Sequence, residues 1–232
     1  MRVAIVPARG GSKRVPQKNF RDLNGSPTIV RTLRILERSR VFDRIVVSTD
    51  HPQIKKLSES VGAEVPFTRP ESLADDYCTT KEVIEHAIGE IKLDDPNGAV
   101  CCVYPTAVLL EPDTIRTGLE LLQKNPSRFV VSVKSFEHPV GRAMLIDRDS
   151  LRPVELSNTS SRTQDCVDFV HDAGQFYWGS VASWTSTRGI LDTGAVPLRL
   201  NRLAGLDVDT MEDWFLLNAL IKYREADNES IK

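Results

Sequence analysis

Short apolar runs alternate along the chain with longer segments in which apolar residues recur at helical spacing. Each run is four to seven residues long and is followed by polar or turn residues, as is typical of strands buried on both faces of a sheet. The order strand, helix, strand, helix, strand at the beginning of the chain predicts a parallel sheet with right-handed crossovers, and therefore an α/β fold. The predicted strands lie at residues 3–6, 44–50, 64–67, 99–104, 129–133 and 196–200.

Turn and capping residues mark where the predicted helices begin. Ser26 is expected to be an N-cap with Pro27 at the first helical position. Thr79 and Glu82 have the spacing of a capping box, which predicts another helix start. The remaining predicted helices begin near Pro52 and Pro112, and a last amphipathic helix spans residues 210–223.

The alternation of strands and helices stops after Ser135. Residues 136–170 have no helical period, and the stretch 157–165 is polar and rich in turn residues. We therefore expect an inserted antiparallel arm or flap at 136–170, extending outward from an α/β domain made of residues 1–135 and 171–232.

Composition limits the classes of function. The chain has 232 residues and a net charge of −2, so its overall charge does not indicate a nucleic-acid partner. No apolar stretch is long enough to span a membrane, and the first apolar run is too short for a signal peptide. The cysteines show no C-x-x-C spacing, which favours reduced, buried thiols in a cytoplasmic protein over disulfides or zinc. These cysteines are Cys78, Cys101, Cys102 and Cys166.

A basic, glycine-rich loop follows the first strand, with the sequence PARGGSKRVPQKN at residues 7–19. Pro7 ends the strand, and the small residues 10–12 leave backbone N–H groups open to an anion. The P-loop and Rossmann spacings are both absent, so a loop wrapping a triphosphate fits better than a dinucleotide turn. The alternative is a solvated loop whose glycines serve only the turn. The cations of the loop are Arg9, Lys13, Arg14 and Lys18.

Two acidic residues flank an apolar one near the end of the chain, at Asp207, Val208 and Asp209. In an extended segment both carboxylates share one face while Val208 points to the other, towards the core. Two carboxylates on one face suit Mg²⁺ that also binds substrate phosphates. The alternative is that Asp209 or Thr210 caps the last helix, and these residues alone leave the two open.

Several segments together resemble the CMP-sialic acid synthetase family, the cytidylyltransferases that activate acidic nine-carbon sugars. The stretches VCCVYPTA and HDAGQFYWG are similar to the pseudaminic acid branch, whereas the sialic acid branch has Gln-Pro-Thr and N-G-A-I-Y there. The resembling segments are the 7–19 loop, RPESLADD at 69–76, VYPTA at 103–107, HDAGQFYWG at 171–179 and DVDT at 207–210.

The resemblance implies a Rossmann-like nucleotidyltransferase fold of the nucleotide-diphospho-sugar transferase type, with a mostly parallel sheet between helices. It also implies that the 136–170 arm dimerises, giving a homodimer in which one subunit reaches the neighbour's sugar site. The implied reaction transfers CMP from CTP, with Mg²⁺, to the anomeric hydroxyl of a nine-carbon 2-keto sugar acid such as pseudaminic acid, and releases pyrophosphate.

The resemblance also assigns roles to individual residues. Catalytic charge neutralisation on the triphosphate falls to Arg9, Lys13 and Lys18, and Mg²⁺ binding to Asp207 and Asp209. The implied nucleotide-binding residues are Ala8, Arg9, Gly10, Gly11, Ser12, Lys13, Asn19, Arg69 and Thr80. The implied sugar-binding residues are Tyr104, Gln164, His171, Gln175 and Tyr177.

Other interpretations of these residues remain open. Arg69 has a surface ion pair as its alternative, and Thr80 has plain helix capping. Tyr104 departs from the glutamine of the sialic acid branch, and Gln164 matches the family only with an insertion.

Alternative functions also remain open at this level. The first is the same reaction on N-acylneuraminic acid, legionaminic acid or the eight-carbon Kdo. The others are a catalytically silent CTP-binding module and a purely structural oligomer. The sequence contains no Ser-His-Asp or Cys-His arrangement that would favour covalent catalysis, and it does not identify a general base.

Overall fold

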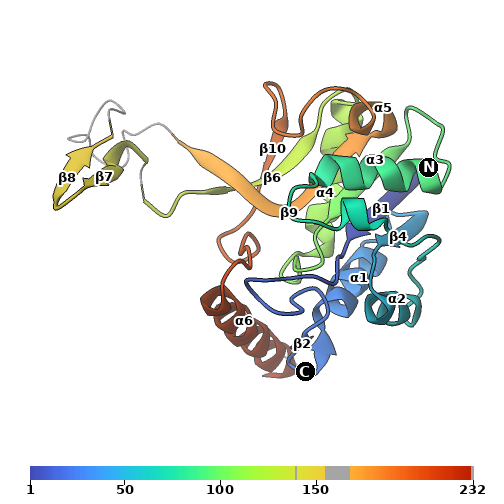
Figure 1. Cartoon of the computed structure of the whole chain (residues 1–232), viewed down its shortest axis with the longest axis horizontal. Coiled ribbons are helices and arrows are strands. Elements are labelled where there is room, and N and C mark those ends of the chain that lie inside the picture. Colours follow the sequence, from blue (N-terminus) through green and yellow to red (C-terminus); the bar gives the residue numbers. More distant parts are fainter. Residues whose placement is uncertain (139, 155–167, 231–232) are drawn as a thin grey trace.

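A six-stranded sheet forms the centre of the computed structural model, which describes residues 1–138, 140–154 and 168–230 (Figure 1). The strand order is β10-β6-β9-β5-β1-β4. Strand β1 pairs in parallel with β4 and β5, and β10 pairs in parallel with β6. Strand β9 runs antiparallel between β5 and β6. The predicted α/β fold with a mostly parallel sheet is therefore confirmed. The strands are β1 (Arg2–Pro7), β4 (Arg44–Ser48), β5 (Ala99–Val103), β6 (Val130–Ser135), β9 (Val170–Ser180) and β10 (Val196–Arg199).

Helices cover both faces of this sheet and enclose two apolar clusters. Phe176 and Trp178 on β9 point into the cluster beneath α1 and α4. Tyr177, between them in sequence, points into the other cluster, against α3 and α5. This alternation is the two-residue period of a strand, and it explains why an almost uniformly apolar segment can serve both faces. The helices are α1 (Thr28–Ser39), α2 (Pro52–Glu59), α3 (Thr80–Glu90), α4 (Pro112–Lys124) and α5 (Val181–Trp184).

A third apolar cluster joins the last helix, α6 (Met211–Ser230), to the loop that follows β1. Val15 from that loop and Val208 from the segment before α6 are both fully buried there, next to Trp214. Figure 1 shows α6 lying beside the N-terminal loop and β2. The cluster therefore brings the basic loop and the two-aspartate segment to the same end of the molecule.

Two local predictions were wrong. Ser26 does not cap α1, because its backbone pairs with Leu23 in the short hairpin of β2 (Asp22–Leu23) and β3 (Ser26–Pro27), and α1 begins at Thr28. The run at 64–67 forms only a single parallel bridge, between Glu64 and Val46. Pro66 has no N–H group to extend that pairing. By contrast, the capping box of Thr79 and Glu82 at the start of α3 is confirmed.

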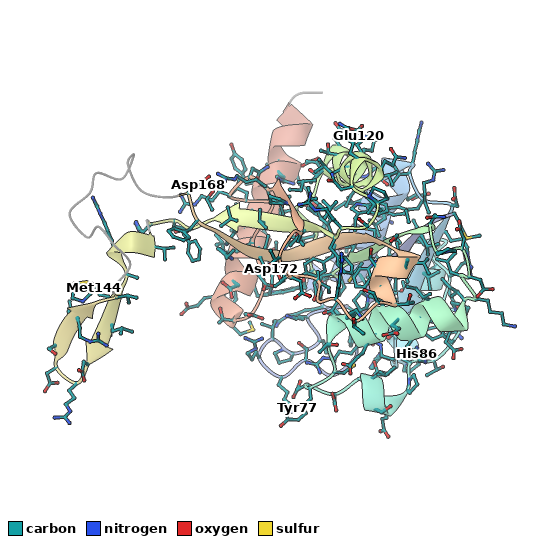
Figure 2. The ribbon with its side chains drawn as sticks, turned by 90° about the horizontal axis from the view of Figure 1, so that it is seen from above. Tyr77, His86, Glu120, Met144, Asp168 and Asp172 are labelled. Atoms are coloured by element: carbon teal, nitrogen blue, oxygen red, sulfur yellow. The ribbon has the colours of Figure 1, made fainter. Side chains whose placement is uncertain are left out.

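Between β6 and β9 the chain leaves the sheet, as Figures 1 and 2 show. Strands β7 (Met144–Asp147) and β8 (Ser150–Pro153) pair antiparallel with each other, after a short turn of helix η2 (Val140–Arg142). All residues of β7 and β8 are exposed. The chain is back in the sheet at Val170, at the end of the segment predicted as an arm.

Candidate active site

A cavity of about 400 Å³ opens at the carboxyl ends of β1 and β5, the edge of an open α/β sheet where ligands usually bind. Its walls come from the basic loop, the segment between β4 and α3 with its short η1 helix (Glu71–Leu73), the beginning of β9 and the segment before α6. The predicted site residues that line it are Arg9, Lys18, Asn19, Arg69, Thr80, Tyr104, Tyr177, Asp207 and Asp209.

Two cations of the basic loop converge on one carboxylate. Arg9 Nη2 lies 2.7 Å from Asp76 Oδ1, and Lys13 Nζ lies 2.6 Å from Asp76 Oδ2. Hydrogen bonds from Lys13 and Arg9 hold the pKa of Asp76 below its ordinary value. Asn19 fixes the loop from inside, since its Nδ2 donates to the Arg9 carbonyl at 2.8 Å. The arrangement shows that this loop can present two positive charges to a single anionic group.

The small residues of the loop do not line the cavity, and neither does Lys13. Ala8 is buried, and its N–H donates to the Ser48 carbonyl at 2.9 Å. Gly10 has a packing reason to be glycine, because a Cβ there would lie 2.5 Å from the His51 ring. Gly11 has no such reason, since no atom of the described residues lies within 4 Å of the position that a Cβ would take there. Ser12 also lies outside the cavity wall.

The aspartate pair has the geometry that its spacing predicts. Val208 is fully buried while Asp207 and Asp209 both line the cavity. Asp209 Oδ1 lies 2.8 Å from Arg14 Nη2 and 3.7 Å from Lys18 Nζ. Arg14 thus lines the site together with the predicted cations.

Capping of α6 uses other groups. Thr210 Oγ1 accepts the Asp213 N–H at 3.2 Å, and the Asp213 carboxylate accepts the Thr210 N–H at 2.8 Å. The side chain of Asp209 has no part in this reciprocal pair. Thr210 therefore caps the helix, and the carboxylates of Asp207 and Asp209 remain directed to the cavity.

The carboxylates of Asp207 and Asp209 fit a hard divalent cation. Burial, followed by the negative charge of Asp209, raises the pKa of Asp207, so this position would be stabilised by added positive charge. The described residues contain no group of three or more His, Cys, Asp or Glu side chains able to hold a metal. Two carboxylates are what Mg²⁺ uses when waters and substrate phosphates complete its shell.

Arg69 is buried, with 4% of its surface exposed, and is not part of a surface ion pair. Its Nε donates to Ser48 Oγ at 3.1 Å, and its Nη2 donates to the Ser48 carbonyl. Burial lowers the pKa of Arg69 to about 10, against the opposing charge of Asp50. The guanidinium therefore lies at the end of β4 as a fixed positive charge in the cavity wall.

Elsewhere in the cavity wall, hydroxyl groups form two short hydrogen bonds. Thr80 Oγ1 and Tyr104 Oη are 2.5 Å apart, and Tyr177 Oη donates to Asp172 Oδ2 at 2.5 Å. Asp172 Oδ1 also accepts the Gly174 N–H at 2.9 Å. Burial raises the pKa of both tyrosines. Figure 2 shows Asp172 on the main body, well away from the arm residue Met144.

Asp172 is a cavity residue that the sequence reasoning missed. The available signal was an acid beside His171, within the resembling segment 171–179. His171 itself does not line the cavity, since its Nδ1 lies 2.7 Å from the Asp172 carbonyl and its ring packs against Phe136. Gln175 is buried and donates to the carbonyls of Ala173 and Leu206. The predicted residue Gln164 lies outside the described residues.

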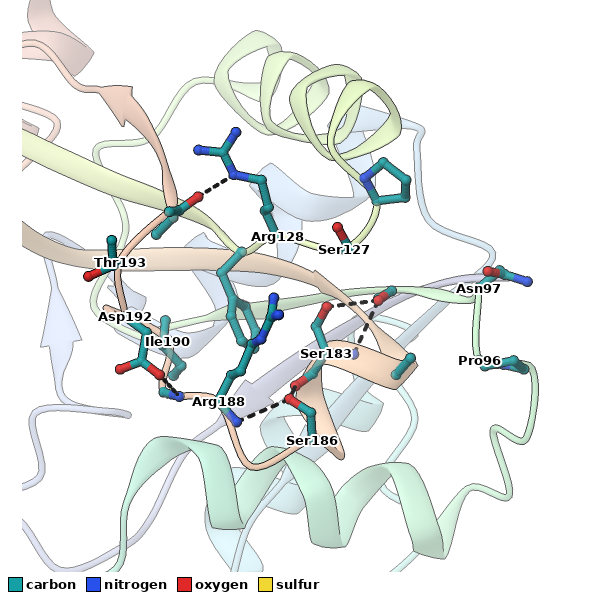
Figure 3. Close-up of a pocket in the computed structure, with 17 residues that line it drawn as sticks. Pro96, Asn97, Ser127, Arg128, Ser183, Ser186, Arg188, Ile190, Asp192 and Thr193 are labelled. Carbon is teal, nitrogen blue, oxygen red and sulfur yellow. Dashed lines mark hydrogen bonds between the residues drawn. The ribbon is translucent and has the colours of Figure 1, made fainter.

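A larger cavity, of about 620 Å³, lies at the opposite edge of the sheet (Figure 3). Arg128, Arg188 and Ser183 contribute to its wall. None of the predicted site residues lines it. It adjoins the amino ends of the parallel strands, so it is separate from the edge that gathers the cations and carboxylates.

Comparisons with known proteins identify relatives along most of the chain. A family model described as cytidylyltransferase matches residues 3–153. The pseudaminic acid cytidylyltransferase of Campylobacter jejuni is 33% identical over 222 residues, which is 95% of this chain and 96% of that protein. The CMP-N,N'-diacetyllegionaminic acid synthase of Legionella pneumophila is 32% identical over 235 residues, covering 96% of this chain and 97% of that protein.

Among solved structures, a CMP:2-keto-3-deoxy-manno-octonic acid synthetase complexed with CTP superposes with a TM-score of 0.67 and 15% identity. The match covers 96% of this chain and 99% of that chain, and at this identity it shows the shared fold. A search of the helices in the described residues found none that is both long and apolar enough to cross a bilayer.

Proposed function

The chain belongs to the cytidylyltransferase family, and we propose that it transfers CMP from CTP to the anomeric hydroxyl of pseudaminic acid, releasing pyrophosphate. The observation that carries this proposal is the cavity at the carboxyl edge of the sheet. It joins cations from the N-terminal loop to two carboxylates that lie almost two hundred residues later in the chain. A nucleoside triphosphate with a bound divalent cation needs both cationic side chains and carboxylates.

In the proposed reaction the sugar hydroxyl attacks the α-phosphorus of CTP in line with the leaving group. A P–O bond to the sugar forms, the P–O bond to the β-phosphate breaks so that pyrophosphate departs, and the hydroxyl proton passes to solvent. Arg9 and Lys13 would exchange the Asp76 carboxylate for phosphate oxygens, since both already converge on one anionic group. Lys18 would place a positive charge next to Asp209. The contribution of these residues is positioning and electrostatic stabilisation of the developing charge.

Mg²⁺ is the divalent cation that we propose for Asp207 and Asp209. When bound it would supply positive charge to the phosphate oxygens and lower the pKa of the attacking hydroxyl. Asp207 and Asp209 would hold it, while Arg14 and Lys18, which contact Asp209 in this structure, would limit the negative charge of the pair.

We further propose that the protein is a cytoplasmic homodimer. The arm of β7 and β8 projects from the body with its side chains exposed, so a second copy is a suitable partner for it (Figure 1). The described cysteines, Cys78, Cys101 and Cys102, are free thiols, as is usual in a reducing compartment. Roles for His171, Gln175 and Gln164 in sugar binding stay predictions.

Pyrophosphate release is the test of this function. CTP and Mg²⁺ would be incubated with pseudaminic, N,N'-diacetyllegionaminic or N-acetylneuraminic acid or with Kdo, each with an EDTA control. Turnover with pseudaminic acid that EDTA abolishes is the expected result. Turnover with a different sugar alone would overturn the substrate and keep the reaction, and the legionaminic acid is the main competitor because of the Legionella relative. CTP binding without any pyrophosphate release would instead indicate a binding module.

A further inference from the structure

The turn that follows β4 contacts the basic loop through backbone groups of the loop. The Ala8 N–H donates to the Ser48 carbonyl at 2.9 Å, which continues the pairing of β1 with β4 one residue beyond β1. Two residues later, the Gly10 N–H donates to Asp50 Oδ1 at 2.8 Å. The carboxylate of Asp50, which lies on the surface, therefore extends the contact between these two segments into the basic loop itself.

The peptide group between Arg9 and Gly10 is held on both sides. Its N–H donates to the carboxylate of Asp50, and its carbonyl accepts Asn19 Nδ2 at 2.8 Å. Rotation of this peptide plane would break both hydrogen bonds, so the pair fixes its orientation. The side chain of Arg9 leaves the chain at the Cα next to this peptide and lines the cavity. The two bonds therefore determine the direction in which the Arg9 guanidinium extends.

The turn that carries Asp50 is itself well anchored. The next residue, His51, accepts the Gln53 N–H with Nδ1 at 3.2 Å and so caps the start of α2. The His51 ring also stacks on Phe20, with 4.8 Å between the ring centroids and 27° between the ring planes. Phe20 is buried and follows directly on the basic loop. Asp50 is thus attached both to the beginning of a helix and to the end of the loop that it contacts.

The negative charge of Asp50 also acts on a second cation of the cavity. The Arg69 N–H donates to the Thr49 carbonyl at 2.9 Å, which places Arg69 beside the same turn. Burial lowers the pKa of Arg69, and the charge of Asp50 opposes this effect, so it favours the charged guanidinium. Arg9 and Arg69 both line the cavity, whereas Asp50 does not. Asp50 therefore acts on the site through other residues.

We propose that Asp50 is a positioning residue for the triphosphate of CTP, an inference that rests on the proposed function. Its carboxylate holds the Arg9–Gly10 peptide, so that the Arg9 guanidinium extends into the cavity before CTP arrives. An acid near a phosphate site is unfavourable by charge alone. The gain is preorganisation, because a cation that is already oriented loses less conformational freedom when the nucleotide binds.

Titration calorimetry with CTP and Mg²⁺ tests the proposal on two variants of Asp50. Asp50→Ala loses the acceptor and the charge, and we expect it to weaken CTP binding about tenfold. Asp50→Asn keeps an oxygen that can accept the Gly10 N–H, so its affinity should return to within about threefold of the wild type. Equal losses in the two variants would overturn the role of this hydrogen bond, and so would an unchanged affinity in Asp50→Ala.

Asp43 provides the matched control, because it makes the same kind of contact at the other end of β4. Asp43 Oδ2 accepts the Arg2 N–H at 2.7 Å, and Arg2 is the first residue of β1. Asp43→Ala should lower the melting temperature at least as much as Asp50→Ala does, and should change the Kd for CTP less than about twofold. An equal loss of CTP affinity in Asp43→Ala would overturn the proposal, because any loosening of β1 from β4 would then suffice. A wild type that does not bind CTP would refute the proposed function itself, and this inference with it.

Discussion

Asp207 carries a carboxylate whose ionised form is costly in this fold, because burial and the charge of Asp209 both raise its pKa. A folded-state pKa above the unfolded value means that stability from this group falls as pH rises through the two values. We therefore expect Asp207→Asn, in metal-free buffer at neutral pH, to be at least as stable as the wild type. Its turnover with Mg²⁺ should fall about a hundredfold or more, because a metal ligand is lost. Thermal unfolding with EDTA and pyrophosphate release measure the two effects.

Asp213 provides the matched control, since it is a nearby acid with a shift of the opposite sign. Burial raises its pKa, but hydrogen bonds from Thr210 and from the Asp209 N–H outweigh burial and lower it overall. Its contribution to stability is present above the unfolded pKa and is lost as pH falls through the folded one. Asp213→Asn should therefore lose about 0.5–2 kcal/mol at neutral pH, as a lost helix cap does. An Asp207→Asn variant that is destabilised as much as Asp213→Asn would contradict the electrostatic account.

Cys78 offers a probe of nucleotide binding, because it lines the proposed nucleotide cavity. Burial and then the charge of Glu82 raise its pKa, so alkylation should be slower than for a free cysteine near pH 8 and should accelerate as pH rises. Saturating CTP should slow it further by covering the thiol. Mass spectrometry of the labelled peptides would locate the reaction. The buried Cys101 and Cys102 are internal controls that should label only on unfolding. Labelling of Cys78 at the same rate with and without CTP would remove the nucleotide from this cavity.

Local chain geometry accounts for the site residues that the sequence predicted well. Val208 points inward and its two acidic neighbours face the cavity. Successive side chains of an extended segment point to opposite faces, and this alternation can be predicted from adjacent residues alone. Asp172 could not be predicted in this way. Its position depends on Tyr177, whose hydroxyl donates to its carboxylate, and on how β9 runs along the cavity. Gln175, which was predicted to bind the sugar, instead donates its side-chain amide to backbone carbonyls that only the folded chain brings near it.

At the scale of elements, α4 packs on β9 through a glycine. A Cβ at Gly118 would lie 2.6 Å from Trp178 Cδ1 and 3.2 Å from Phe176 Cε2. Gly118→Ala gains helix propensity of about 1 kcal/mol, but overpacking a core costs about 1–3 kcal/mol. We expect a net loss of stability because both rings are fully buried and cannot move aside. Chemical denaturation would measure the change in the free energy of unfolding.

Gly89, in α3, is the matched control for that substitution. Apart from its chain neighbours and the backbone of α3 itself, no atom of the described residues lies within 4 Å of a Cβ placed there, so Gly89→Ala gains propensity without a steric cost. It should stabilise the protein by a few tenths to about 1 kcal/mol, less than a central position because the helix ends at Glu90. If Gly118→Ala and Gly89→Ala both stabilised the protein, this result would contradict the tight contact between α4 and β9.

The elements themselves were predictable where one local signal dominated. The capping box at Thr79 fixed the start of α3, and apolar runs located β1, β4 and β5. The prediction of a strand failed at 64–67, where Pro66 interrupts the pairing with β4. The prediction of an N-cap failed at Ser26, whose backbone pairs in a short hairpin. The antiparallel direction of β9 had no local signal, because strand direction follows from the route of the chain through the arm.

At the scale of the whole molecule, the arm is the part that the described chain leaves uncovered. Ile146 on β7 is 82% exposed, and Leu151 on β8 pairs directly with it. An isolated two-stranded hairpin is marginal in water, and exposed apolar side chains on it favour association. A second copy of the chain supplies an identical apolar surface through a two-fold interface. The proposed homodimer therefore buries this hairpin.

Charges placed on the arm should separate the subunits. We expect the double variant Ile146→Asp, Leu151→Asp to sediment as a monomer at concentrations where the wild type is a dimer, because buried carboxylates in an apolar interface are costly. Leu216→Asp on α6 adds one charge to an exposed apolar position outside the arm and should leave the dimer intact. If the arm also completes the neighbour's sugar site, the monomer should bind CTP normally yet lose turnover. A wild type that is monomeric throughout, or a double variant that remains dimeric, would show that the arm does not form the interface.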